Sequence, residues 1–147
     1  MPDSDRALRV AALRLLTRRD HSRAELKAKL AADAESAEQL ETVLDALEAE
    51  RLLSDHRYAT QRVVARAGRY GDSRLRQELR QNGVSDDDIS AALPEGGDET
   101  QRCRAVWARK FRQPPQSIEE RARQMRFLQY RGFSSEALRR AMRGGDE

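Results

Sequence analysis

The chain has 147 residues and a formal net charge of +3, and charged residues make up 36% of it, against about 25% in an ordinary soluble domain. No apolar run reaches the roughly 20 residues that a membrane span requires, and no apolar stretch near Met1 resembles a secretory signal, so we expect a cytoplasmic protein with no membrane partner. The single cysteine, Cys103, excludes an internal disulfide, and the lack of a Cys/His cluster predicts that the chain holds no metal.

The first third of the chain shows helical periodicity, which predicts helices over 5–18, 22–32 and 37–50. A serine followed three residues later by Glu or Gln predicts a capping box, in which the two side chains satisfy the first free amides of a helix. Ser22 with Glu25 and Ser36 with Gln39 supply two such starts. No β-branched alternating run is long enough for a strand.

The same signals continue through the rest of the chain. Helices are predicted over 55–68, 72–82, 86–92, 98–112, 118–131 and 135–143. Ser54, Ser85 and Ser134 are N-cap candidates, because acidic residues follow them and suit the positive end of a helix. Ser117 with Glu120 repeats the capping box. We therefore predict an all-α protein of about nine short helices.

A repeat with a period of 49 residues relates the last two thirds of the chain. In each copy a helix is predicted to end at a glycine able to adopt the left-handed conformation, followed by a buried apolar residue and a serine cap. The aligned residues are Leu79, Gly83, Val84, Ser85, Ile89, Ala92 and Leu93 with Leu128, Gly132, Phe133, Ser134, Leu138, Ala141 and Met142. The first third shares the spacing more weakly, so we predict three tandem three-helix repeats over 1–53, 54–97 and 98–147.

Each of these units is too small to bury a large core and is expected to gain stability by docking on its neighbours. This predicts an elongated, curved arrangement. Charge is uneven, because the three units carry net charges of −2, 0 and +5. The adjacent glycines Gly96 and Gly97 predict a joint at which the last unit can swing.

No arrangement of residues predicts catalysis. His21 and His56 stand at the starts of different helices without a nucleophile, so each is interpreted as a turn or cap residue. Cys103 lies on an apolar helix face, which favours a buried thiol over a reactive one. Asp86–Asp88 follow the cap at Ser85 and are interpreted as complementing the helix dipole rather than holding a cation. We expect a protein that is not an enzyme and uses no cofactor.

Arginine dominates the candidate contact surface, since 25 of the 28 basic residues are arginines. For the middle unit, a solvated face with pairs such as Arg74–Glu78 and a functional face are equally supported. For the last unit, the charge of +5 favours a functional electrostatic surface. The aromatic residues are predicted to be mainly core, with Tyr70 as the main exception. The candidate contacts on these grounds are Arg66, Arg69, Arg76, Arg123, Arg126, Arg139 and Arg140.

Three groups of residues follow one another in an order that matches a known family. The first unit carries Leu15 to Ser22, then Glu25-Leu26 and Leu30. The middle unit carries Leu53, Asp55, Arg57-Tyr58-Ala59, Tyr70-Gly71, Arg74, Glu78-Leu79 and Gly83. The last unit carries Arg109-Lys110-Phe111, Arg121, Phe127-Leu128 and Arg131-Gly132-Phe133. Over nearly its whole length the chain thus resembles the bacterial RecX family, regulators of the RecA recombinase.

The chain departs from the family pattern at two positions. Arg51 stands where members often have a glycine, so it must tolerate the left-handed conformation or end its helix differently. Tyr58 stands where phenylalanine is usual, and its hydroxyl needs a partner.

The resemblance implies a monomeric, non-enzymatic regulator of recombination and DNA repair. Such a protein binds in the helical groove of RecA filaments on single-stranded DNA and inhibits ATP hydrolysis, strand exchange and coprotease activity. The residues that match the family's middle-unit motif, and are further partner-binding candidates, are Asp55, Arg57, Tyr58, Tyr70, Gly71, Arg74 and Glu78. The alternative hypothesis is a module of tandem helical units that binds nucleic acid directly; within the first hypothesis, direct DNA binding is expected to be weak.

Overall fold

The computed structural model describes residues 3–143, and over this range the chain forms nine α-helices, one short 3₁₀ helix and no strand. In chain order they are α1 (Asp3–Arg18), α2 (Arg23–Leu30), α3 (Ala37–Ala49), α4 (Asp55–Arg66), α5 (Asp72–Gln81), α6 (Asp86–Ala92), the 3₁₀ helix η1 (Leu93–Gly96), α7 (Glu99–Lys110), α8 (Ile118–Tyr130) and α9 (Ser135–Arg143). The predicted all-α fold of three three-helix units is confirmed. The predicted outer ends of the first and third units, 1–2 and 144–147, lie outside the described residues.

The predicted serine caps explain where six of the nine helices in residues 3–143 begin. Each serine hydroxyl accepts a hydrogen bond from the amide three residues later, at 3.0–3.2 Å, and the caps are Ser22, Ser36, Ser54, Ser85, Ser117 and Ser134. The full capping box forms at Ser22, whose amide donates to Glu25 at 3.1 Å. At the other two predicted boxes the returning side chain, Gln39 or Glu120, accepts from the amide one residue before the cap instead.

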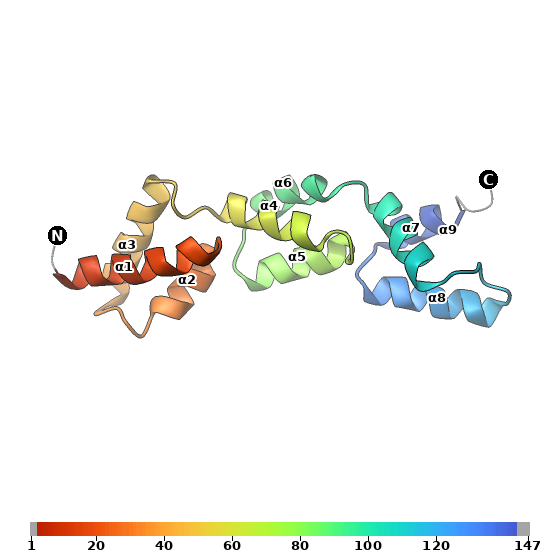
Figure 1. Ribbon diagram of the computed structural model, residues 1–147, viewed down its shortest axis with the longest axis horizontal. Coiled ribbons are helices and arrows are strands. Elements are labelled where there is room, and N and C mark those ends of the chain that lie inside the picture. The colour runs from red at the N-terminus through yellow and green to blue at the C-terminus, as the bar shows by residue number, and fades with distance from the viewer. Residues whose placement is uncertain (1–2, 144–147) are drawn as a thin grey trace.

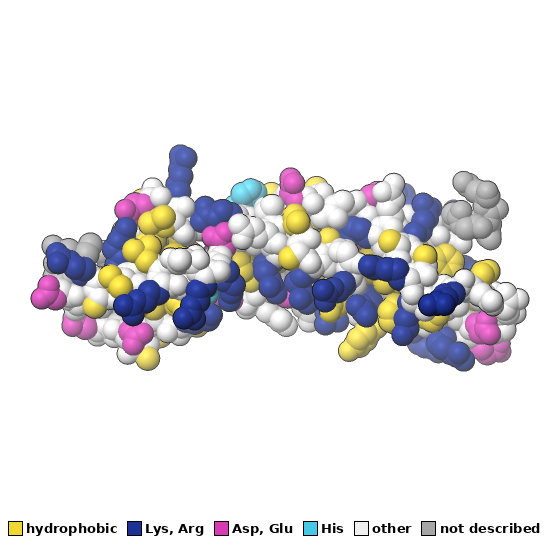
Figure 2. All heavy atoms as spheres, in the orientation of Figure 1, with side chains coloured by type: hydrophobic (Ala, Val, Ile, Leu, Met, Phe, Trp, Pro, Cys, Tyr) yellow, Lys and Arg dark blue, Asp and Glu magenta, His cyan; other side chains and the backbone are white. Residues whose placement is uncertain are grey.

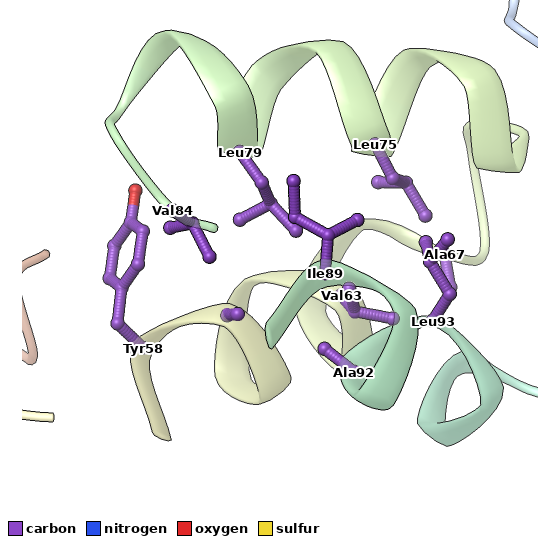
Figure 3. Packing of buried hydrophobic residues seen from close by; sticks show 10 residues of the cluster. Tyr58, Val63, Ala67, Leu75, Leu79, Val84, Ile89, Ala92 and Leu93 are labelled. Carbon is purple, nitrogen blue, oxygen red and sulfur yellow. The ribbon is translucent and has the colours of Figure 1, made fainter. Parts of the chain in front are cut away.

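Each unit has its own small core. In the middle unit, side chains from α4, α5 and α6 meet between the three helices (Figure 3), and the buried tyrosine Tyr58 closes one end. The first unit buries a leucine-rich cluster, and the third buries one around Leu128 and Leu138. The three cores are separate, so the units must be held together by contacts of another kind.

The turns that end three of the helices use the left-handed backbone conformation. Gly83 and Gly132, which the repeat aligns, have φ angles of 79° and 91°. Arg51 has a φ of 64°, and it is the only non-glycine residue with a positive φ between residues 3 and 143. The arginine therefore adopts the conformation for which a glycine is usual at this position.

The units lie in a row, with the first and third units at opposite ends of the molecule (Figure 1). At the first joint, between the first and second units, the N-terminus of α2 meets the α5–α6 turn. Ser22 Oγ donates to the carbonyl of Asn82 at 2.6 Å, and the amide of Arg23 donates to Asp55 at 2.7 Å. The second unit thus supplies a carboxylate that caps a helix of the first.

The second joint, between the second and third units, repeats this geometry. The N-terminus of α5 meets the α8–α9 turn, and the amide of Gly71 donates to the carbonyl of Arg131 at 2.8 Å. Glu99 accepts from the amide of Asp72 at 2.9 Å and from the hydroxyl of Ser134 at 2.8 Å. A carboxylate at the first residue of the next unit's first helix again caps the second helix of the unit before it.

A buried arginine, Arg102, binds the segment Gly96–Gly97, where the sequence predicts a joint at which the last unit can swing. Arg102, 9% exposed, donates to the carbonyls of Ala67 and Tyr70 at 2.8 and 2.7 Å and to Asp72 at 2.9 Å. The same guanidinium donates to the carbonyl of Gly97 at 3.2 Å. The segment 96–97 is therefore tied to both neighbouring units instead of standing free between them.

Candidate functional site

Three of the motif residues lie at the first joint and are engaged inside the protein. Asp55 caps α2 as described, and burial raises the pKa of its carboxyl group. The guanidinium of Arg57 pairs with Asp20 at 3.0 Å, across the same joint. Tyr58 is buried and its hydroxyl accepts from Asn82 at 2.8 Å, so the extra hydroxyl has its partner. Asp55 and Arg57 therefore join the first two units, whereas the bond of Tyr58 lies within the second unit.

Two further motif residues also make internal contacts. A Cβ at Gly71 would overlap the backbone of Gly132 and Phe133, so glycine is required for the close approach of the third unit. Glu78 accepts from Arg62 at 2.7 Å and from Arg66 at 2.8 Å. The carboxylate of Glu78 therefore neutralises part of the charge on the middle unit.

The second joint brings basic and aromatic side chains from two units together. We call this region the joint surface. It consists of Arg66, Arg69, Tyr70 and Arg74 from the middle unit and Arg109, Lys110, Phe127, Tyr130 and Arg131 from the third. Only some of these residues are sequence-predicted candidates, and the tertiary structure adds the others.

Cations lie over the aromatic rings throughout the joint surface. The guanidinium carbons of Arg66 and Arg74 are both 4.7 Å from the ring centre of Tyr70. The guanidinium of Arg131 lies 5.4 Å from the ring centre of Tyr70 and 5.1 Å from that of Phe127. Such stacking orients each guanidinium plane while its N–H edges can still bind a phosphate or carboxylate.

A hollow of about 320 Å³ opens on the joint surface. Its lining residues are Arg69, Val106, Arg109, Lys110, Phe127 and Arg131. On the face shown in Figure 2, Lys and Arg side chains lie along the whole length of the molecule. Over the middle and third units hydrophobic side chains lie among them, and acidic side chains gather mainly toward the ends. An anionic partner with flat apolar groups fits this chemistry.

The remaining arginine candidates lie elsewhere on the second and third units. Arg123 and Arg126 are exposed on α8, and neither forms an ion pair within residues 3–143. Arg139 and Arg140 are exposed on α9, where Arg140 pairs with Glu136 at 2.7 Å. Arg76 is half-buried on α5. The structure does not bring these five side chains into the joint surface.

Sequence reasoning missed Tyr130. The expectation that the aromatic residues are mainly core is wrong for this side chain, which is 78% exposed. A signal was present, because the 49-residue repeat aligns Tyr130 with Gln81, a polar residue that is also exposed. An aromatic residue at a position that is polar in the other copy indicates a role outside the core.

The residues considered for catalysis take structural roles. His21 is buried, its Nδ1 lies 3.0 Å from the carbonyl oxygen of Arg19, and burial lowers its pKa. Cys103 is fully buried, as predicted, and burial raises its pKa to about 11. In the part of the chain that the structure describes, no three His, Cys, Asp or Glu side chains are grouped so as to hold a metal ion. Within the same range no helix has the length and apolar character needed to cross a bilayer.

Comparison with known families identifies all three units. The model of the first three-helix domain of RecX matches residues 9–47, that of the second matches 54–93, and that of the third matches 98–142. Together these matches cover most of the chain and follow its three-unit organisation.

Individual relatives agree with the domain models. The chain is 44% identical to the regulatory protein RecX of Ralstonia nicotianae, over 99% of this chain and 92% of the relative, and 44% identical to that of Ectopseudomonas mendocina, over the full length of both. The crystal structure of RecX from Lactobacillus salivarius shares the fold, with a TM-score of 0.87 at 18% identity and 99% of each chain covered. A second crystal structure, of regulatory protein RecX, gives a TM-score of 0.81 at 25% identity over 99% of this chain and 74% of the other. The relatives are named as regulatory proteins rather than as enzymes. The chain belongs to the RecX family.

Proposed function

We propose that this protein regulates the RecA recombinase by binding in the helical groove of RecA filaments on single-stranded DNA. In this proposal it inhibits ATP hydrolysis, strand exchange and coprotease activity, and so modulates recombination and DNA repair in the cytoplasm. The observation that carries the proposal is the match to RecX in all three units, in order and over most of the chain. The protein acts by occupying a surface, as a monomer and without catalysis or a cofactor.

The row of units and their charges support this mode of action. A molecule made of three units in line can contact several protomers of a filament at once, which strengthens binding without a large single interface. We take the units as residues 1–53, 54–97 and 98–147, with net charges of −2, 0 and +5. The basic third unit is placed toward DNA phosphate or an acidic protein surface.

The candidate residues divide into two roles in this proposal. The residues that set the angle between units are Asp55, Arg57 and Gly71, while Tyr58 and Glu78 hold the middle unit in shape. The residues that contact the filament are the joint surface together with Arg76, Arg123, Arg126, Arg139 and Arg140. The first group acts through the shape of the molecule and the second through its charge.

The direct test measures RecA activity as the protein is added. RecA is assembled on single-stranded DNA with ATP, and hydrolysis and strand exchange are followed while the protein is titrated to an equimolar amount. The proposal expects both rates to fall as the protein binds. Unchanged rates at equimolar protein would contradict it.

Charge reversal tests the contact surface. Arg123→Glu with Arg126→Glu is expected to weaken filament binding by about 10-fold or more, because two favourable charges become unfavourable. Helicity should be unchanged, since Arg and Glu have similar helix propensities. Co-sedimentation with filaments measures binding, and circular dichroism measures helicity.

The matched control reverses two exposed arginines of the acidic first unit. Arg6→Glu with Arg14→Glu makes the same change in total charge on α1. This variant should bind filaments much more tightly than the α8 variant. Equal losses in the two variants would show that total charge, rather than the third unit, governs binding.

The alternative hypothesis, a nucleic-acid-binding module for which RecA is irrelevant, makes a different prediction. It expects the same DNA affinity with and without RecA and no effect on hydrolysis that competition for DNA does not explain. The affinity of such a module should also fall steeply as salt rises. Comparing binding to bare DNA and to preformed filaments at one salt concentration separates the two functions.

A further inference from the structure

Tyr130 is exposed without a packing reason. Its side chain is 78% exposed at the last residue of α8, although tyrosine gains most when its ring is buried. The corresponding residue of the middle unit, Gln81, is polar. The guanidinium of Arg74, 5.9 Å from the ring centre, lies over this ring. One exposed ring beside a cation offers an apolar face to something outside the protein.

The cations around Tyr130 are held in place by other rings. Arg74 lies over Tyr70 as well as Tyr130, so its guanidinium stands between two aromatic side chains. Arg131 lies between Tyr70 and Phe127, and the ammonium of Lys110 lies 5.3 Å from the ring centre of Phe127. Cations ordered in this way lose less conformational freedom when they bind an anion than free surface side chains do.

The joint surface is also strongly positive. Six of its nine residues are Arg or Lys, and the carboxylate of Glu78 beside them already pairs with Arg62 and Arg66. A partner must therefore bring its own negative charge. The surface carries rings as well as cations, and a single-stranded nucleic acid supplies both phosphates and flat π faces in one chain.

We propose that the joint surface binds the unpaired strand itself, with a base stacked on Tyr130 and phosphates on Arg74, Arg131 and the hollow beside Phe127. This assignment rests on the function proposed for the whole chain and names the DNA, rather than the recombinase, as the ligand of this surface. The surface prefers single strands to duplex, because the bases of a duplex are stacked on each other and cannot reach Tyr130. An acidic protein segment would satisfy the cations and leave the exposed ring without a planar partner.

The test uses the full chain and DNA without RecA, so its outcome is independent of the filament experiments. Fluorescence anisotropy measures binding to a labelled oligothymidine of about 15 nucleotides, and to a duplex of the same length, at about 50 mM salt. The wild-type chain should bind the single strand more tightly than the duplex. No detectable binding of the single strand, or equal binding of the two DNAs, would overturn the assignment.

Substitutions at Tyr130 separate stacking from charge. Tyr130→Gln introduces the residue that the middle unit has at the equivalent position, Gln81. This variant should bind the single strand about 5-fold to 100-fold more weakly than the wild type, and its affinity for the duplex should stay within about 2-fold of the wild-type value. Tyr130→Phe should bind as the wild type does, because stacking needs the ring and not the hydroxyl. The control is Ile118→Ala, an 84% exposed side chain at the opposite end of the same helix, which should bind normally.

Two results would refute the stacking role. The first is single-strand binding by Tyr130→Gln equal to that of the wild type. The second is displacement of the oligothymidine by a poly-glutamate peptide of equal charge as efficiently as by unlabelled oligothymidine, which would assign the surface to acidic protein instead. Loss of RecA inhibition in Tyr130→Gln is not required, and its presence or absence bears only on the function proposed for the whole chain.

Discussion

At the residue scale, two glycines near the second joint differ in whether the structure would accept a larger residue in their place. Gly71 meets the backbone of the third unit, and an added Cβ would overlap it. Three residues earlier, Gly68 has open space around the position of a Cβ and no positive φ. The same amino acid is thus essential for packing at one position and free to change at the other.

Gly71→Ala is expected to lower the free energy of unfolding by about 1–3 kcal/mol, because backbone must move to admit the methyl group. Gly68→Ala should leave it unchanged or raise it by up to about 1 kcal/mol, since alanine restricts the unfolded chain. Urea denaturation followed by circular dichroism measures both. A Gly71→Ala protein as stable as Gly68→Ala would show that the two units do not approach as closely as described.

A second residue-scale feature is a histidine buried in its neutral form. Nε2 of His21 lies 3.2 Å from Nζ of Lys29, and Nδ1 lies next to the carbonyl of Arg19. The geometry requires a proton on Nδ1 and a free lone pair on Nε2, facing the lysine. The pKa of His21 is lowered below its ordinary value, mainly because the ring is buried and also because Arg19 and Lys29 place positive charge nearby.

The lowered pKa of His21 predicts that stability falls in mild acid. The unfolded chain binds a proton near pH 6.5 and the folded chain only at lower pH, so protons favour unfolding below about pH 6.5. The free energy of unfolding should therefore decrease from pH 7.5 to 5.5, and less so in His21→Gln. The nearby carboxylate of Glu25, whose pKa is lowered, titrates below this window. Equal pH dependence in the two proteins would exclude this role for His21.

At the element scale, both joints use one device. The first residue of a unit's first helix points its carboxylate at the start of the preceding unit's second helix, as Asp55 does for α2 and Glu99 for α5. A carboxylate suits this position because helix N-termini have free amides and a positive dipole end. The three units, whose hydrophobic cores are separate, are thus joined by polar caps at helix N-termini.

The two caps differ in the number of bonds they make. The carboxylate of Glu99 accepts three hydrogen bonds, from the amide of Asp72 and from the amide and the hydroxyl of Ser134. The carboxylate of Asp55 accepts one, from the amide of Arg23. We expect Glu99→Ala to cost about 2–3 kcal/mol of unfolding free energy and Asp55→Ala about 1 kcal/mol.

Hydrogen exchange locates the effect of each variant. The amide of Asp72 should exchange faster in Glu99→Ala, and the amide of Arg23 should exchange faster in Asp55→Ala. Exchange that rises equally at both amides in either variant would indicate general unfolding rather than loss of one cap.

At the scale of the whole molecule, the orientation of the third unit depends on Arg102. Arg102 belongs to the third unit, and its buried guanidinium donates to the carbonyls of Ala67 and Tyr70 and to the carboxylate of Asp72, all in the second unit. Removing a buried charge partner leaves carbonyls and a carboxylate without donors, which is costly. The row of units should therefore behave as one body while this arginine is present.

Arg102→Met is expected to broaden the distribution of distances between the second and third units. Spin labels at Gln77→Cys and Arg121→Cys report it, because the native Cys103 is buried with a raised pKa and does not compete for label. Wild type should give one narrow distribution. The control is Arg104→Met, an exposed neighbour, which should match wild type. A narrow distribution in Arg102→Met would show that other contacts suffice.

Local signals in the sequence predicted most of the secondary structure and part of the candidate site. Helix periods, serine caps and the paired glycines Gly83 and Gly132 act over a few residues, so their outcome depends little on the rest of the chain. Tyr70 and Arg74 could be singled out for the same reason. Tyr130 and Arg131 could not be joined to them, because the two pairs lie about 60 residues apart in the chain and meet only at the second joint.

The sequence by itself therefore determined the helices, their order, the three small cores and the family, since each follows from local patterns or from their repetition. Only the tertiary structure decided which contacts hold the units together. It turned Asp55 and Gly71 into parts of the joints, closed the glycine segment with Arg102, and assembled one surface from two units. The physical reason is that docking between small units depends on polar groups from distant parts of the chain, and their partners become neighbours only once the helices have packed.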